Sequence, residues 1–214
     1  MTKHTRNKLI YGSIGIVGFI LFVLFTFMVK KDIVDQFDFN TTVRLQNHIP
    51  EKIDPIFSFF SILGSFEVTT ATLVIVVLLM RKIKNVTIII SYIVAHVIEI
   101  LGKSLIYHPG PPFMFFRYNL GFYFPSAYVN TGSSYPSGHT FRTVFLSVIF
   151  AFLVWRSKKM KLSTKLLIFT FFFCFDVIML VSRVSLGEHW TTDVIGGTLL
   201  AISLATLSIA FIPD

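Results

Sequence analysis

Two polar segments interrupt the long apolar stretches of this sequence, and each carries a histidine. The first, residues 136–139, reads PSGH, and the second, residues 182–193, reads SRVSLGEHWTTD. Together with the upstream Lys103, they supply two imidazoles, a guanidinium, a carboxylate and an ammonium. Phosphoryl transfer uses this set, because it needs a nucleophile, a proton donor and cations for the phosphate oxygens. We therefore expect a phosphoryl-transfer site.

In the second segment, His189 and Asp193 are four residues apart. On a helix they would lie on one face, where the carboxylate accepts a proton from one ring nitrogen and leaves the other as a nucleophile. Arg183 precedes His189 by six residues and offers a planar fork that matches phosphate oxygens. A salt bridge between Arg183 and Asp193 or Glu188 at a helix end is the alternative, and it is the commoner role for such an arginine.

In the first segment, Pro136 is suited to the first turn of a helix. The backbone amides of Ser137, Gly138 and His139 would then form an anion site with the positive end of the helix dipole. Gly138 would let the backbone approach the anion closely. The alternative is a helix cap with an incidental histidine.

A metal site is a further alternative, because His139, His189 and Asp193 could ligate zinc. Lys103 and Arg183 would repel a cation and attract an anion. We therefore expect neither a metal nor another cofactor.

The composition places these segments in a membrane protein. Apolar residues make up 54% of the chain, charged residues 14%, and the mean hydropathy is +0.74. The formal charge of +8 could suggest nucleic acid, but the basic residues lie in short clusters between apolar runs. We expect the bilayer as a partner and no nucleic acid.

The apolar runs predict an all-α bundle of six transmembrane helices in one domain covering residues 1–214. The predicted spans are residues 9–29, 66–80, 86–106, 137–155, 166–181 and 189–212. The first run is too long for a signal peptide and lacks a cleavage site. Residues 30–55 read as a mixed, charged connection, 56–63 as an interfacial segment and 108–136 as a loop rich in proline and glycine.

The basic clusters orient this bundle. The N-terminus, residues 81–84 and residues 156–165 are rich in Lys and Arg, and all fall on one side of a six-span chain. That side should be cytoplasmic, with both termini, in the cell membrane. Both histidine segments then meet at the extracytoplasmic face. Glu99 and Lys103 are one helical turn apart and could pair, and charges at that depth indicate a polar cavity.

Residues 136–139, and Ser182-Arg183 followed by His189 and Asp193 at this spacing, resemble the second and third signatures of the type 2 phosphatidic acid phosphatase (PAP2) family. The resemblance implies a six-helix membrane fold in which His189 attacks phosphorus and forms a phosphohistidine. Asp193 would orient His189, and His139 would protonate the leaving oxygen and then activate water. It implies no metal. The phosphate oxygens would be held by Lys103, Arg183, Ser137 and Gly138.

The first signature of that family is a lysine, six residues and then Arg-Pro, but Lys103 is followed at this distance by Gly110-Pro111. Arg142, Arg117 or a protonated His108 could supply the missing charge. For Arg142 the alternative role is snorkelling at a helix end or a bond to a loop carbonyl. The site could also take a different phosphate ester or a diphosphate, or serve only in binding.

These observations indicate a lipid phosphatase. Its substrate would be phosphatidic acid, phosphatidylglycerol phosphate or a polyprenyl diphosphate. A lipid phosphotransferase and a weakened lipid-binding membrane protein remain the alternatives.

Overall fold

The computed structural model describes residues 3–80, 86–128 and 132–212, and these residues form helices without any strand. The prediction of an all-α membrane fold is confirmed. The helices are α1 (Lys3–Lys30), α2 (Asp35–His48), α3 (Asp54–Leu63), α4 (Phe66–Met80), α5 (Val86–Leu105), α6 (Gly138–Arg156), α7 (Leu162–Ser185) and α8 (Thr191–Ala210). Short 3₁₀ turns are η1 (Glu51–Ile53), η3 (Phe113–Phe115) and η4 (Pro125–Tyr128).

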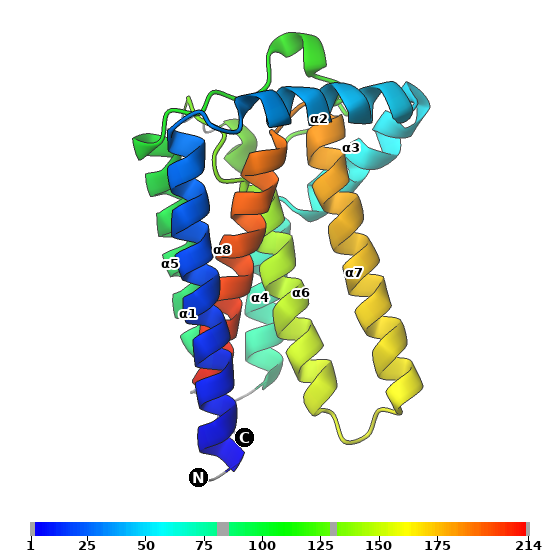
Figure 1. Cartoon of the computed structure of the whole chain (residues 1–214). Helices are drawn as coiled ribbons and strands as arrows, with labels where there is room; N and C mark the ends of the chain where they lie inside the picture. The colour runs from blue at the N-terminus through cyan, green and yellow to red at the C-terminus, as the bar shows by residue number, and fades with distance from the viewer. Residues whose placement is uncertain (1–2, 81–85, 129–131, 213–214) are drawn as a thin grey trace.

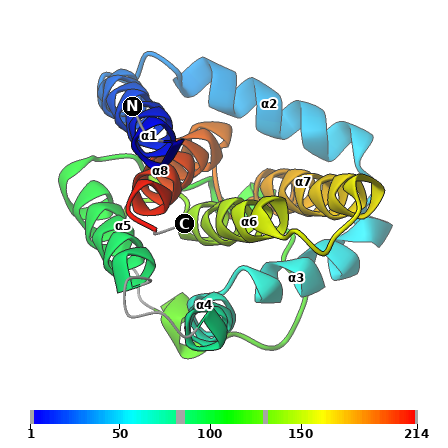
Figure 2. The same ribbon diagram turned by 90° about the horizontal axis from the view of Figure 1, so that it is seen from below.

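The helices α1, α4, α5, α6, α7 and α8 run along roughly one direction, whereas α2 lies across one end of the bundle; α1 begins and α8 ends near the other end (Figure 1). Seen along the bundle, α8 sits between α1, α5 and α6 (Figure 2). Its most extensive contacts are with α1, and small residues permit them: a Cβ at Gly15 would lie 2.5 Å from the Leu207 side chain. The central position of α8 places its first turn in the middle of the bundle end that α2 covers.

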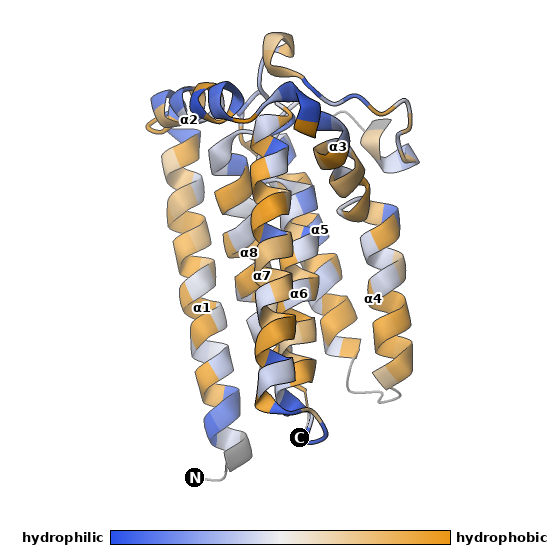
Figure 3. Cartoon of the chain, turned by 90° about the vertical axis from the view of Figure 1, so that its right-hand side faces the viewer, coloured by the Kyte–Doolittle hydropathy of each residue, from blue (hydrophilic) through white to orange (hydrophobic). Residues whose placement is uncertain are grey.

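Among the described residues, five helices are long and apolar enough to cross a membrane, and α3 with α4 makes a sixth candidate span, which is bent. With 15 residues, α4 rises only about 22 Å, less than the hydrocarbon thickness of about 30 Å. The segment at 56–63, predicted to be interfacial, lies in α3, which joins α4 through a bend of 47°. Apolar residues dominate the spans, whereas α2 is polar (Figure 3).

Three boundary predictions were wrong. The connection at 30–55 contains α2, whose mixed residues show no clear apolar stripe in the sequence. The turn predicted at 182–189 is shorter, because α7 continues to Ser185 and includes Arg183 in its last turn. The last helix starts at Thr191, so His189 precedes it. The basic cluster predicted at 81–84 lies outside the described residues.

Candidate active site

A cavity of about 420 Å³ opens at the end of the bundle near α2, and both motif histidines line it. His139 comes from the first turn of α6, and His189 from the turn between α7 and α8. Lys103, Gly138 and Arg142 line the same space. The fold thus brings the two polar segments to one cavity.

His189 contacts Asp193 across the start of α8. Its Nδ1 lies 3.2 Å from Asp193 Oδ2, which also accepts a hydrogen bond of 2.8 Å from the backbone amide of Trp190. The expected helical face was wrong, because Trp190 is the N-cap of α8 and the pair forms through capping geometry. Burial lowers the pKa of His189, although the Asp193 contact raises it. The ring is therefore neutral near pH 7, with Nε2 away from Asp193.

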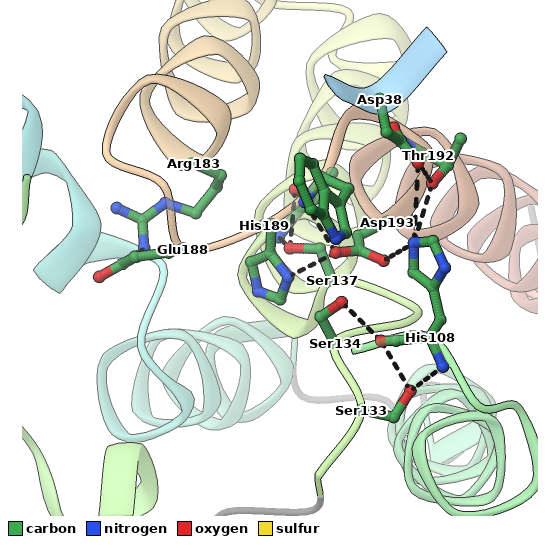
Figure 4. Close-up of polar contacts among 12 residues, drawn as sticks. Asp38, His108, Ser133, Ser134, Ser137, Arg183, Glu188, His189, Thr192 and Asp193 are labelled. Carbon is green, nitrogen blue, oxygen red and sulfur yellow. Dashed lines mark hydrogen bonds and ion pairs between the residues drawn. The ribbon is translucent and has the colours of Figure 1, made fainter. Parts of the chain in front are cut away.

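The other oxygen of Asp193 faces a second histidine (Figure 4). His108 Nε2 lies 3.5 Å from Asp193 Oδ1 and 3.7 Å from Asp38 Oδ2. Asp38, on α2, accepts hydrogen bonds from the amide (2.8 Å) and the hydroxyl (2.5 Å) of Thr192. Burial raises the pKa of the Asp38 carboxyl, although the bonds from Thr192 lower it.

This placement corrects the expectation that His108 replaces the missing arginine. Its side chain is buried behind Asp193 and does not line the cavity. Neither His108 nor Asp38 could be connected to Asp193 from the sequence, because the Asp38 contact with Thr192 spans 154 residues.

The helix α6 begins later than expected. Pro136 precedes the helix and is not part of its first turn, and Ser137 is the N-cap, whose side chain accepts a hydrogen bond from the Thr140 amide. The Ser137 amide donates to the Asp193 carbonyl at 3.0 Å, so the expected use of this amide for an anion needs correction. Gly138 does line the cavity, and a Cβ there would collide with the Glu99 carboxylate.

The cations on the α5–α6 side share one carboxylate. Lys103 Nζ lies 2.8 Å from Glu99 Oε1, which confirms the expected pair. Arg142 NH1 lies 3.5 Å from Glu99 Oε2, and its Nε donates to the Gly64 carbonyl at 3.1 Å. His96 Nδ1 also contacts Glu99, at 3.2 Å. These contacts hold Arg142 in the wall of the cavity, between the turn that precedes α4 and the helix α5.

On the opposite side, Arg183 is fully buried and its NH1 donates to the Glu188 carboxylate (Figure 4). This is one of the two salt bridges considered as alternatives to a phosphate role. Its Nε and NH2 make no hydrogen bond to the described residues. Glu188 itself lines the cavity, so Arg183 lies directly behind the wall.

Arg117 and Gly110 lie away from the cavity. The guanidinium of Arg117 donates to the Ile49 and Gln46 carbonyls at 3.3 Å each, so it fastens the long loop to α2. The expectation that it supplies the missing charge is therefore corrected. Gly110 is exposed, and a Cβ there would have only the Ser134 side chain nearby, at 3.6 Å.

The long loop lines the cavity with aromatic side chains that the sequence analysis did not predict as part of the site. They are Phe116, Tyr118, Phe122, Tyr123 and Phe124. The loop is attached to α4, because the amide and hydroxyl of Ser126 both donate to the Glu67 carboxylate at 2.9 Å. The density of aromatic residues between 113 and 124 was the available signal.

Chemically, the arrangement combines a neutral imidazole held by a carboxylate, a second imidazole, and cations facing the same space. It is suited to an anion that undergoes nucleophilic attack and proton transfer. Within residues 3–80, 86–128 and 132–212, no three His, Cys, Asp or Glu side chains converge as metal ligands do.

Comparisons with known proteins identify the family and similar folds. Residues 82–214 match the PAP2 superfamily. The fold is similar to the crystal structure of a transmembrane PAP2-type phosphatidylglycerolphosphate phosphatase from Bacillus subtilis, with a TM-score of 0.75 and 18% identity over 92% of this chain and 95% of that one. It is also similar to Aquifex aeolicus LpxE, with a TM-score of 0.61 and 22% identity over 81% and 94% of the two chains. No curated protein sequence matches significantly.

Proposed function

This chain belongs to the PAP2 superfamily, and on that premise we propose that it is a membrane phosphatase whose substrate is a phosphorylated lipid. The observation that carries the proposal is that His139, His189, Lys103 and Arg142 line one cavity. The whole chain would act as one membrane domain. Its several apolar helices make it a multi-pass membrane protein.

In the proposed reaction, His189 Nε2 attacks phosphorus while its Nδ1–H group keeps a hydrogen bond to the Asp193 carboxylate. The N–P bond forms as the bond from phosphorus to the lipid oxygen breaks, and His139 protonates that oxygen. His139 then takes a proton from water, which attacks the phosphohistidine and releases inorganic phosphate. The contact of 3.2 Å between His189 and Asp193 supports this assignment, since it leaves Nε2 free of the carboxylate.

The cations would stabilise the charge that builds on the phosphate oxygens. Lys103 and Arg142 face the cavity directly, and the Gly138 amide lies at the start of α6. Arg183 is buried behind Glu188, so it would favour the anion by its charge and not by a direct contact. Arg142 would take the part of the missing motif arginine. A metal ion is not required, because these cations favour an anion.

Behind Asp193, His108 would act as a positioning residue. It lies within 3.5 Å of Asp193 and 3.7 Å of Asp38, so it can hold the carboxylate that orients the nucleophile. Asp38 would in turn fix His108 and the first turn of α8 through Thr192.

A lipid substrate is supported by an apolar cavity of about 240 Å³ between α4, α6 and α7. Leu63 and Thr143 line it, and each is next in sequence to a residue of the phosphate cavity, Ile62 or Arg142. A chain attached to the phosphate could lie there while the head group occupies the polar cavity.

We place the phosphate cavity on the extracytoplasmic face. Both termini and the connection between α6 and α7 lie at the opposite end (Figure 1). That end carries Lys8, Arg156 and the lysines of residues 158–165, and such clusters stay in the cytoplasm.

The test is phosphate release by purified protein in detergent with a metal chelator present. Phosphatidic acid, phosphatidylglycerol phosphate and a polyprenyl diphosphate serve as substrates. His189→Gln should abolish release, a loss of at least about 1,000-fold, and His48→Gln, which changes an exposed histidine outside the cavity, should have no effect. Release that persists in His189→Gln contradicts the mechanism, and a new phospholipid formed from an added alcohol indicates transfer instead of hydrolysis.

A further inference from the structure

A second, larger cavity of about 540 Å³ lies at the opposite end of the bundle from the histidines. It opens between the first turns of α1, the end of α6 and the end of α8. Its described lining is Asn7, Lys8, Tyr11, Phe152, Trp155, Arg156, Lys158, Ile209, Ala210 and Ile212. None of these residues lines the phosphate cavity, so this is a separate site.

Three cations surround this second cavity, which we call the basic cavity. They are Lys8, Arg156 and Lys158, and no Asp or Glu is among its described lining residues. The Lys8 ammonium lies 4.9 Å from the centre of the Phe211 ring, and the Arg156 guanidinium lies 5.4 Å from that of Phe152. Aromatic rings therefore hold the charged groups at the rim, where they can meet an anion.

An apolar groove of about 330 Å³ adjoins the basic cavity. It is lined by Tyr11, Val148, Ala151, Phe152, Trp155, Phe169, Thr206 and Ile209. Four of these residues also line the basic cavity: Tyr11, Phe152, Trp155 and Ile209. Val148 lies two turns further into the span than Trp155, so the groove extends from the charged rim toward the membrane interior.

We propose that this end of the bundle binds an anionic phospholipid, with its phosphodiester at the three cations and one acyl chain in the apolar groove. Basic crevices between transmembrane helices recognise such head groups. A zwitterionic lipid would fill the groove equally well but would carry no net charge to the rim. A free phosphate ion would leave the groove unused.

Trp155 provides a reporter of occupancy, because it lines both the basic cavity and the groove and its side chain is 59% exposed. The experiment reconstitutes the full chain into vesicles in which brominated phosphatidylglycerol or brominated phosphatidylcholine replaces the unlabelled lipid. Phosphatidylglycerol should quench Trp155 at a mole fraction about fivefold lower than phosphatidylcholine does. In the variant Lys8→Gln, Arg156→Gln, Lys158→Gln, the two lipids should quench equally.

A matched variant removes the same number of charges at the other end: Lys30→Gln, Lys31→Gln, Lys52→Gln, all exposed. This matched variant should keep the fivefold preference. Trp155→Phe removes the reporter, so the difference between the two lipids should no longer be seen in its fluorescence. Any quenching left in Trp155→Phe reports on Trp190. Because the readout is fluorescence, it does not depend on the proposed phosphatase activity.

Three results would overturn the proposal. The first is equal quenching by the two lipids in the unmodified protein. The second is a preference that survives removal of the three cations or disappears equally in the matched variant. The third is loss of the preference on adding inorganic phosphate at constant ionic strength, which would assign the basic cavity to a free anion.

Discussion

The two walls of the phosphate cavity distribute their charges differently. On the α7–α8 wall each basic group has its own carboxylate, His189 with Asp193 and Arg183 with Glu188. On the α5–α6 wall a single carboxylate, Glu99, contacts Lys103, Arg142 and His96. The α7–α8 wall contains every residue of the third signature, whereas the α5–α6 wall lacks the arginine of the first signature.

The difference teaches that a signature can be incomplete in sequence while its charge is present in space. Gly110 removes a guanidinium from the loop, and Arg142 brings one to the cavity from α6. His108, which lies between Lys103 and Gly110 of the incomplete signature, contacts Asp193 on the other wall. The two walls are therefore coupled through one loop.

The strongest test of this contrast is Arg142→Gln. Removing a guanidinium that we propose to bind the phosphate oxygens should lower kcat/KM for phosphate release about 100-fold. Arg117→Gln is the control, since its guanidinium binds only loop and α2 carbonyls. If Arg117→Gln loses as much activity as Arg142→Gln, with an unchanged melting temperature, the charge of the missing motif arginine is not supplied by Arg142 of α6.

An intermediate effect is expected from the residues behind Asp193. His108→Gln and Asp38→Asn should each lower kcat about tenfold, with KM unchanged, because the nucleophile is less well held. The double variant should be no worse than either single one, since both act on the same carboxylate. Additive losses, or a change in KM alone, would separate this network from catalysis.

The smallest effect concerns the protonation of His189. Burial lowers its pKa, so the ring stays neutral at lower pH than an exposed histidine and is lost as a nucleophile only when the pH falls through that lowered value. Diethyl pyrocarbonate modifies neutral imidazole. Its reaction with His189, followed by peptide mass spectrometry, should have a midpoint below about pH 6.5. A midpoint above this ordinary histidine value contradicts the expected direction of the shift.

The helices α1, α4, α5, α6, α7 and α8 each overlap one predicted span, because apolar runs bounded by charges are local signals. It also predicted the pair Glu99 and Lys103, since a spacing of four on a helix determines the contact. It failed for α2, whose helical stability comes from lying across the bundle and not from its own pattern.

For the site, the spacing of His189 and Asp193 indicated their contact but not its form. The pair meets because Asp193 caps its own helix, which depends on where α8 begins. The sequence did not show which of Arg142, Arg117 and His108 faces the cavity in place of the missing motif arginine, because this depends on the path of the loop. No local pattern in the sequence records that Arg117 reaches α2 or that His108 reaches α8.

The extensive packing of α1 on α8 has a consequence for biosynthesis. The ribosome delivers α1 first and α8 last, so α1 waits among lipids for its main partner while the intervening helices insert. Asp193 enters the membrane with that last helix, and His189 arrives just before it. The main helix packing of α1 and the contact between His189 and Asp193 therefore form only once α8 has inserted.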